Sequence, residues 1–95
     1  MAGLHARRCL VSGKVQGVFF RASTRQKAIE LSCAGYAENL ADGRVEVLAI
    51  GEMNSVAQLI DWLRVGPPAA QVAAVQVEEL DLDALKQVPV GFAAR

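Results

Sequence analysis

Hydrophobic and polar positions follow two different periods along this chain of 95 residues, and the changes of period divide it into separate elements. Stretches rich in Val, Leu and Ile with polar neighbours at alternate positions indicate β-strands, whereas apolar residues spaced by three and four indicate amphipathic helices. The pattern predicts strands over residues 6–12, 36–40, 45–50 and around 75–77, helices over 20–33 and 54–65, and a short edge strand within 88–95.

Each predicted helix has one apolar face and a recognisable end. The faces consist of Phe20, Thr24, Ala28 and Leu31 in the first helix and of Met53, Val56, Ile60 and Leu63 in the second. Gly35 is expected to stop the first helix as its C′ residue, and Gly66-Pro67-Pro68 ends the second. Asn54 or Ser55 is expected to cap the start of the second helix.

The Asp42-Gly43 pair predicts a hairpin turn between the second and third strands. The resulting order, β-α-β-β-α-β, is that of the ferredoxin-like split βαβ arrangement, an α+β fold in which two helices cover one face of an antiparallel sheet. No linker or repeat interrupts the chain, so we expect a single domain over residues 1–95. This fold carries many unrelated functions, so function has to be inferred from particular residues.

Composition excludes several classes of protein. Ten basic and ten acidic residues cancel, which leaves no general field to attract nucleic acid or an anionic membrane. No apolar run approaches the roughly 18 residues of a membrane span, and residues 1–8 lack the apolar core of a signal peptide. We therefore expect a cytoplasmic monomer without nucleic-acid or membrane partners. Cys9 and Cys33 are interpreted as small buried residues without a disulfide, metal or redox role.

The segment from Val11 to Arg21 (VSGKVQGVFFR) is where a strand is expected to pass into a helix. Gly13 and Gly17 allow a loop there, and the unpaired N–H groups at the helix start form a seat for an anion. Arg21 adds a planar guanidinium that can bind two oxygens of one phosphate or carboxylate. An arginine at a helix start is disfavoured by the helix dipole unless an anion compensates it, so this loop indicates a phosphoryl ligand.

Several kinds of phosphate chemistry are missing from this loop. Gly13-Lys14 is followed by Val15, so the loop is no Walker A motif, and Val15 also stands six positions before Arg21, where cysteine phosphatases carry their nucleophile. His5 is interpreted as a solvated residue near the terminus, and we see no metal-ligand spacing. The means of catalysis that remain are positioning of the substrate and electrostatic stabilisation. These suit a substrate with a good leaving group, such as an acyl phosphate.

Two further observations concern residues near this loop. Asn39 lies in the second strand just before the hairpin, and its neutral amide is able both to donate to and to accept from a water nucleophile. It would reach the edge of the loop if the first and third strands are neighbours and the second runs beside them, which periodicity leaves open. Phe19 and Phe20 are expected to be core and staple residues rather than a stacking platform, and Trp62 is expected to pack at the edge of the second helix.

Two groups of residues resemble the signatures of the acylphosphatases. Residues 13–21 (GKVQGVFFR) are similar to the first signature, and residues 35–39 (GYAEN) are similar to the second. The similarity continues through residues 43–45, 51, 66–69 and 91–95, so it covers nearly the whole chain in the order of the family. Glu38 departs from the family pattern, in which a basic or neutral residue is usual, and would weaken anion binding if it lay near the site.

The resemblance implies a ferredoxin-like fold and the hydrolysis of acyl phosphates to a carboxylate and inorganic phosphate, without metal, cofactor or covalent intermediate. It also implies that Arg21 holds the phosphate and that Asn39 orients the attacking water. The remaining implied site residues are Gln16, Gly17, Val18, Phe19 and Phe20, whose backbone amides would bind phosphate, and Gly13, which would shape the loop. Inorganic phosphate is then expected to be both product and competitive inhibitor.

Three other functions are compatible with the same fold. An RNA-binding module would need an exposed aromatic pair and a basic sheet face, and apart from Tyr36 the strand positions are aliphatic. A metal-delivery module would need a Cys-x-x-Cys loop after the first strand, which the chain lacks. An inactive relative that holds phosphate without turnover stays open.

Overall fold

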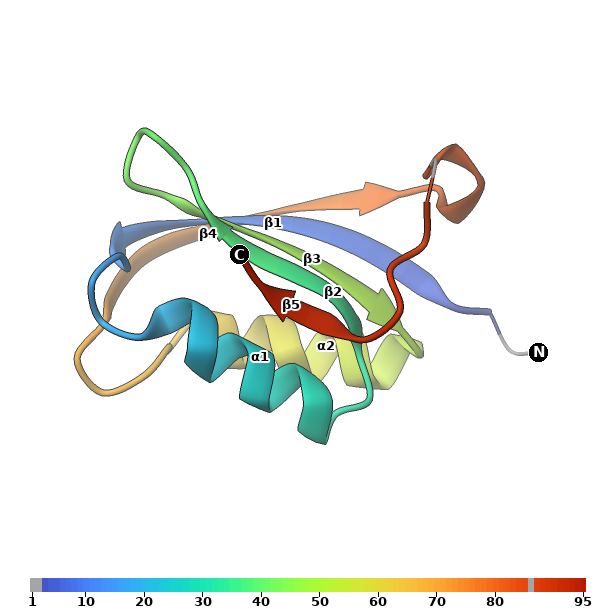
Figure 1. Ribbon diagram of the computed structural model, residues 1–95, viewed down its shortest axis with the longest axis horizontal. Helices are drawn as coiled ribbons and strands as arrows, with labels where there is room; N and C mark the ends of the chain where they lie inside the picture. The colour runs from blue at the N-terminus through green and yellow to red at the C-terminus, as the bar shows by residue number, and fades with distance from the viewer. Residues whose placement is uncertain (1–2, 86) are drawn as a thin grey trace.

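The computed structural model describes residues 3–85 and 87–95, and these form a five-stranded sheet packed against two α-helices (Figure 1). The elements in chain order are β1 (His5–Lys14), α1 (Phe20–Glu30), β2 (Ala34–Asn39), β3 (Val45–Gly51), α2 (Met53–Leu63), β4 (Gln71–Leu80), the 3-10 helix η1 (Leu82–Ala84) and β5 (Phe92–Ala94). The predicted β-α-β-β-α-β order is confirmed. None of the helices in the described ranges is long and apolar enough to cross a membrane.

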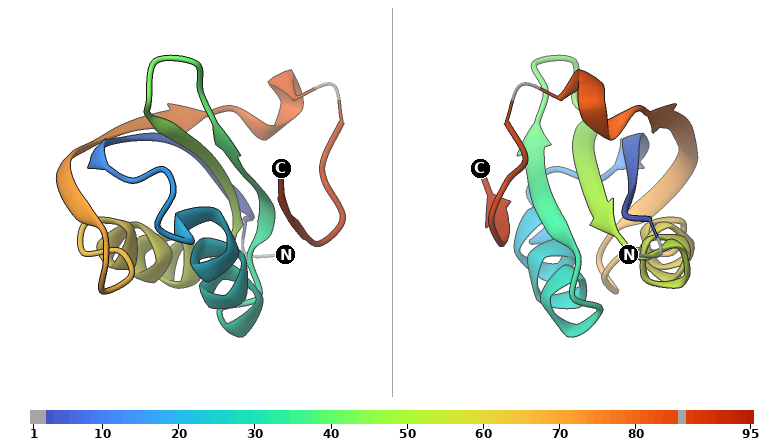
Figure 2. Two further views of the ribbon diagram at one scale, coloured as in Figure 1. Left: turned by 60° about the vertical axis from the view of Figure 1, so that its left-hand side comes forward. Right: turned by 90° about the vertical axis from the view of Figure 1, so that its right-hand side faces the viewer.

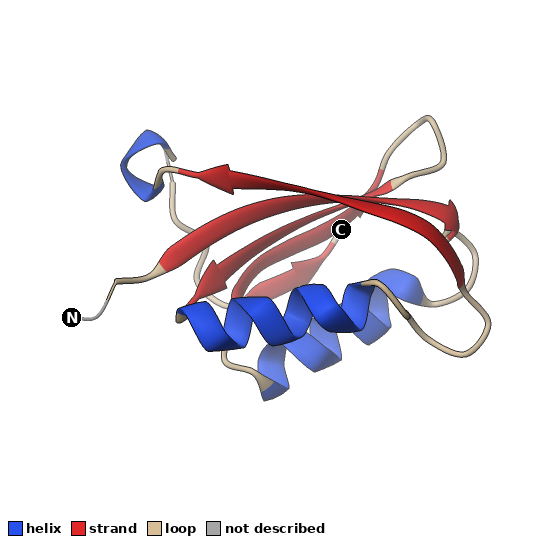
Figure 3. Cartoon of the chain, turned by 180° about the vertical axis from the view of Figure 1, so that it is seen from behind, coloured by secondary structure: helices blue, strands red, loops and turns tan. Residues whose placement is uncertain are grey.

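The strand order across the sheet is β4-β1-β3-β2-β5. β1 pairs antiparallel with both β3 and β4, and β2 pairs antiparallel with β3. Both helices lie on one face of the sheet, as Figures 2 and 3 show from two sides. The predicted ferredoxin-like α+β fold is confirmed, with one refinement: β5 joins the edge of β2 in parallel. β4 and β5 are the two edge strands, so the connection between them carries the chain from one edge of the sheet to the other.

The main core lies between the sheet and the two helices. It contains Cys9, Val11, Val45, Val47 and Ala49 from the strands and Phe20, Ala28, Val56, Leu59 and Leu63 from the helices. A smaller cluster on the opposite face buries Ala6, Leu48 and Ile50 beneath Leu80 and the residues around η1. Because both faces of β3 are covered, its apolar run is continuous rather than alternating.

The predicted buried face of α1 is confirmed for Phe20, Thr24 and Ala28, while Leu31 is half-buried. Thr24 is fully buried, and its hydroxyl donates to the Phe20 carbonyl at 2.8 Å, which satisfies the polar group within the helix. Trp62 is half-buried at the edge of α2, as predicted, and its ring centroid lies 5.9 Å from that of Phe20. This aromatic contact links the two helices.

The prediction that Gly35 stops the first helix is wrong. α1 ends at Glu30, and Ser32 takes the left-handed C′ conformation with φ 59°. The Cys33 N–H donates to the Ala28 carbonyl at 2.8 Å, which is the 6→1 hydrogen bond of a Schellman motif. Gly35 instead lies within β2 at φ 135°, where a Cβ atom would stand 1.8 Å from the main-chain oxygen of Leu48.

The start of α2 also differs from the prediction. The N-cap residue is Glu52, whose side chain makes no capping hydrogen bond, and Asn54 and Ser55 lie inside the first turn. The helix begins earlier because a single residue connects it to the end of β3. Of the predicted apolar face, Val56 and Leu63 are buried together with Leu59, whereas Met53 is 55% exposed and Ile60 is half-buried.

Candidate active site

A pocket of about 370 Å³ opens where the loop between β1 and α1 meets the end of β2. Its lining consists of Val15, Gly17, Phe19, Phe20, Arg21, Ala22, Asn39 and Ala94. The sheet order explains the meeting, because β3 separates β1 from β2 by one strand and the hairpin end of β2 lies beside the loop. Arg21 and Asn39, which the sequence analysis singled out separately, therefore face the same pocket.

Gly13 and Gly17 shape the connection between β1 and α1 for different reasons. Gly17 lines the pocket at φ 75°, and a Cβ atom there would have no described atom within 4 Å apart from its own residue and its two chain neighbours, so its backbone conformation rather than crowding favours glycine. Gly13 lies away from the pocket lining, at the irregularity in the β1–β4 pairing, and a Cβ there would stand 2.2 Å from the Gln71 carbonyl oxygen. Gly13 thus shapes the end of the strand before the loop begins.

Phe19 and Phe20 have opposite surroundings, so the prediction that they are core and staple residues holds only for Phe20. Phe20 is 2% exposed, whereas Phe19 is 83% exposed and belongs to the pocket lining. Phe19 is the N-cap residue of α1, with φ 60° and ψ 25° in the left-handed region. That conformation turns its side chain away from the core. Val18, by contrast, is buried and does not belong to the pocket lining.

The start of α1 is suited to an anion. Within the described part of the chain, no side chain caps the N-terminus of α1, and the first turn of this helix contains no acidic residue. The first-turn N–H groups of a helix lack partners within the helix and carry a partial positive charge. Arg21 adds its guanidinium at the same place.

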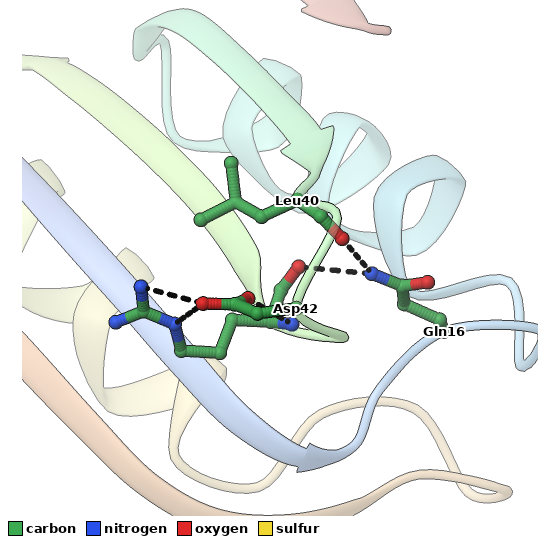
Figure 4. A network of polar contacts seen from close by, with 4 residues as sticks. Gln16, Leu40 and Asp42 are labelled. Carbon is green, nitrogen blue, oxygen red and sulfur yellow. Dashed lines mark hydrogen bonds and ion pairs between the residues drawn. The ribbon is translucent and has the colours of Figure 1, made fainter.

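The Gln16 side chain fastens the loop to the β2–β3 hairpin. Its Nε2 donates to the Leu40 carbonyl at 2.8 Å and to the Arg44 carbonyl at 3.0 Å (Figure 4). The hairpin is held in turn by Asp42, whose carboxylate accepts from the Arg44 backbone and guanidinium. The backbone N–H, followed by the guanidinium, lowers the pKa of Asp42. Sequence analysis missed this role of Gln16, since nothing near it in the chain marks the hairpin as its partner.

Two arginines on successive turns of α1 hold the β5 segment. Arg21 Nη1 donates to the main-chain oxygen of Arg95, and Arg25 Nε donates to the Phe92 carbonyl at 3.2 Å. Arg21 is half-buried, so this contact fixes the guanidinium beside the pocket instead of leaving it in solvent. A guanidinium has further N–H donors, which leaves part of the fork for a ligand.

Glu38 lies away from the pocket lining, since neighbouring residues of a strand point to opposite faces and Asn39 faces the pocket. The Glu38 carboxylate pairs with Arg95 Nη1 at 3.5 Å, and the Arg95 guanidinium also stands 3.9 Å from the centre of the Tyr36 ring. The Tyr36 hydroxyl donates to the Glu46 carboxylate at 2.5 Å. Burial, followed by this hydrogen bond, raises the pKa of Tyr36 to about 12.

The remaining candidate groups lie outside the pocket. His5 is half-buried within β1, where it pairs with Gly51, rather than near a frayed end. Cys9 and Cys33 are buried and free, and burial raises the pKa of both thiols, to about 11 for Cys9. Within residues 3–85 and 87–95, no three His, Cys, Asp or Glu side chains gather closely enough to hold a metal ion.

Comparison with known proteins places the chain in one family. Residues 7–93 match the family model of the acylphosphatases. An acylphosphatase of Halorhodospira halophila is 55% identical over 84 residues, covering 88% of this chain and 91% of that protein. The structure of an acylphosphatase from Coxiella burnetii matches with a TM-score of 0.86 and 43% identity, covering 97% of this chain and 93% of that one. The acylphosphatase structure from Bacillus subtilis matches with a TM-score of 0.87 and 32% identity, covering 98% and 99%. On these matches, the chain belongs to the acylphosphatase family.

Proposed function

We propose that this chain is an acylphosphatase that hydrolyses the carboxyl–phosphate bond of acyl phosphates, releasing a carboxylate and inorganic phosphate. The observation that carries the proposal is the pocket that joins Arg21, the start of α1 and Asn39. Membership of the acylphosphatase family supports the same activity. We further propose that the reaction needs neither a metal ion nor a cofactor.

In this proposal the phosphoryl group lies against the loop, where the backbone N–H groups from Gln16 to Phe20 donate to its oxygens. The uncapped start of α1 supports this placement, because a helix N-terminus favours an anion. Arg21 binds two phosphoryl oxygens through its guanidinium and stabilises the charge that develops during transfer. An anion here also offsets the unfavourable position of Arg21 near the positive end of the helix dipole.

Asn39 orients the attacking water. The amide oxygen accepts a hydrogen from the water and so aims its oxygen at phosphorus. A bond forms from the water oxygen to phosphorus, and the bond from phosphorus to the acyl oxygen breaks. The carboxylate leaves with the electron pair, and the proton of the water passes to the phosphate or to solvent. Among the residues that the structure describes, the pocket lining contains no cysteine, serine, histidine or acidic side chain, which favours direct attack over a covalent intermediate.

The test is hydrolysis of benzoyl phosphate by the purified chain in metal-free buffer, with and without a chelator. We expect turnover that the chelator leaves unchanged, and competitive inhibition by inorganic phosphate. Arg21→Ala should lower the rate about 10³–10⁵-fold, as for other arginine donors to phosphoryl groups. Arg21→Lys is the matched control for charge without the fork. Asn39→Ala should lower kcat more than it raises KM, because the water is needed only for the chemical step.

Two results would contradict the proposal. Near wild-type activity of Arg21→Ala would remove the arginine from the site, and phosphate binding without turnover would identify an inactive relative. A cytoplasmic location, a monomeric state and the lack of nucleic-acid and membrane partners stay predictions. Cell fractionation, size-exclusion chromatography and binding assays with RNA and vesicles would test them.

A further inference from the structure

We propose that Glu38 is a positioning residue for Arg21, although it lies on the face of the sheet opposite the pocket. The Glu38 carboxylate and the Tyr36 ring hold the side chain of Arg95, and the main-chain oxygen of Arg95 accepts from Arg21. Glu38 then favours phosphate binding, although a carboxylate near an anion site otherwise weakens it. This inference rests on the proposed function and adds to its site a residue from outside the pocket.

Arg95 links the far face of the sheet to the pocket. Its N–H donates to the Ala37 carbonyl at 2.8 Å, in line with the parallel pairing of β5 and β2, and its main-chain oxygen accepts from Arg21. Its guanidinium lies on the other face, with Nη1 3.5 Å from the Glu38 carboxylate and its central carbon 3.9 Å from the centre of the Tyr36 ring. One residue therefore couples the two sides.

The β5 strand needs such an anchor. It has three residues, forms one edge of the sheet, and buries only Phe92. A segment with few buried contacts opens at a low free-energy cost. The start of β5 is held by the buried Phe92 side chain and by the hydrogen bond from Arg25 to the Phe92 carbonyl. Beyond its other end, next to Arg21, the strand is held through the contacts of Arg95.

The far face is arranged to hold a guanidinium. The Tyr36 hydroxyl donates to the Glu46 carboxylate at 2.5 Å, which fixes the orientation of the ring on which Arg95 stacks. Glu38 and Glu46 stand directly opposite each other on β2 and β3, and like charges in that position repel. Among the residues that the structure describes, Arg95 is the cation that forms an ion pair there.

The contacts on this face predict a modest change with a particular kinetic signature. Exposed ion pairs and cation–π contacts are individually weak, so we expect an effect of about fivefold. Without Glu38, the Arg21 guanidinium is held at the pocket for a smaller fraction of the time, and the apparent Kd for phosphate rises in proportion. KM rises by the same factor, while kcat is unchanged because bound substrate selects the held position. A loss of folded protein would instead lower kcat and leave KM unchanged.

The experiment measures the Kd for inorganic phosphate by titration calorimetry, and kcat and KM with benzoyl phosphate. The proteins are the wild type, Glu38→Gln, Arg95→Ala and the double variant. We expect Kd to rise about fivefold in Glu38→Gln, whereas removal of a negative charge alone would lower it. In the Arg95→Ala background, Glu38→Gln should no longer raise Kd, because Glu38 acts through Arg95.

Glu78→Gln is the matched control. It also removes the carboxylate of an ion pair with an arginine, Arg8, at 2.8 Å, but on β4 at the opposite edge of the sheet from β5. Its Kd for phosphate should stay within about twofold of the wild-type value. Tyr36→Leu, which removes the ring under Arg95, should raise Kd in the same direction as Glu38→Gln.

Three results would overturn the inference: a Kd in Glu38→Gln equal to or below that of the wild type, the same rise in Kd when Arg95 is already alanine, or a loss confined to kcat. Phosphate binding by the wild type without hydrolysis would contradict the proposed function, yet the comparison of Kd values would still decide the role of Glu38. A wild type that binds no phosphate would contradict both.

Discussion

Substituting Gly35 with asparagine distinguishes two explanations of why a glycine stands at this position. As a helix stop, the residue would tolerate asparagine, which also adopts the left-handed conformation. Within β2, however, a Cβ would lie 1.8 Å from the Leu48 oxygen and 2.7 Å from its carbonyl carbon. These are backbone atoms of the paired strand, so no side-chain rotation relieves the overlap. β2 and β3 would have to separate locally.

The magnitude follows from two contributions. A non-glycine residue held at φ 135° costs about 1–3 kcal/mol. Separating the strands weakens several ladder hydrogen bonds, each contributing about 0.5–1.5 kcal/mol to stability. We therefore expect Gly35→Asn to lower the free energy of unfolding by about 4 kcal/mol, a large part of the roughly 5–15 kcal/mol of a typical domain. For a domain of this size, that loss lowers Tm by roughly 16–32 °C.

Urea unfolding, followed through the fluorescence of the single tryptophan, measures this loss. Trp62 packs against Phe20 and so reports on the core between the helices. Gly43→Asn is the matched control, because Gly43 also has a positive φ, 94°, but a Cβ atom there would have no described atom within 4 Å apart from its own residue and its two chain neighbours. The free energy of unfolding of Gly43→Asn should fall by less than about 1 kcal/mol. A loss in Gly35→Asn no greater than that of the control would refute the strand explanation and restore Gly35 as a helix stop.

Two further predictions concern the hairpin and the pH dependence of stability. Gln16→Met removes the hydrogen bonds to the Leu40 and Arg44 carbonyls while keeping a similar side-chain volume. We expect kcat to fall and the free energy of unfolding, measured in urea, to drop by about 1–3 kcal/mol. An unchanged kcat would mean that activity does not depend on these hydrogen bonds between the loop and the hairpin. The raised pKa values of Cys9, about 11, and Tyr36, about 12, mean that the unfolded state loses these protons first as pH rises. Stability should therefore be intact below pH 9 and decline from pH 9 towards 12, less steeply in Tyr36→Phe, and a flat profile in urea unfolding would contradict the burial of both groups.

Local patterns were sufficient to predict the order of elements but not their exact ends. The strands and helices follow from periodicity, which each segment carries in its own residues. The end of α1 does not, because Gly35 and Ser32 both stand near it and local preference favours glycine. What places Gly35 in β2 is the main-chain oxygen of Leu48 on the neighbouring strand. A contact of that kind depends on the sheet and has no local signature in the sequence.

The candidate site shows the same limit. Arg21 and Asn39 were selected by their chemistry and their place in two signatures, and the structure brings both to one pocket. The exposure of Phe19 was not predicted, because two adjacent phenylalanines in an apolar stretch are expected to be buried and the left-handed turn at α1 separates them. The hydrogen-bond partner of Gln16 was also not predicted, because it lies on the β2–β3 hairpin, which comes close to Gln16 only when the sheet has folded.

The side-chain hydrogen bonds that hold the pocket together all end on main-chain oxygens, and this determines which residues can be substituted. Gln16 donates to the main-chain oxygens of Leu40 and Arg44, and Arg21 donates to that of Arg95. Because each acceptor belongs to the backbone, the partner side chains are free to change without removal of the acceptor, whereas the donors are not. A site that works by positioning requires its groups to be held before the substrate arrives. Substitutions at Gln16 and Arg21 should therefore impair activity more than substitutions at the residues they contact.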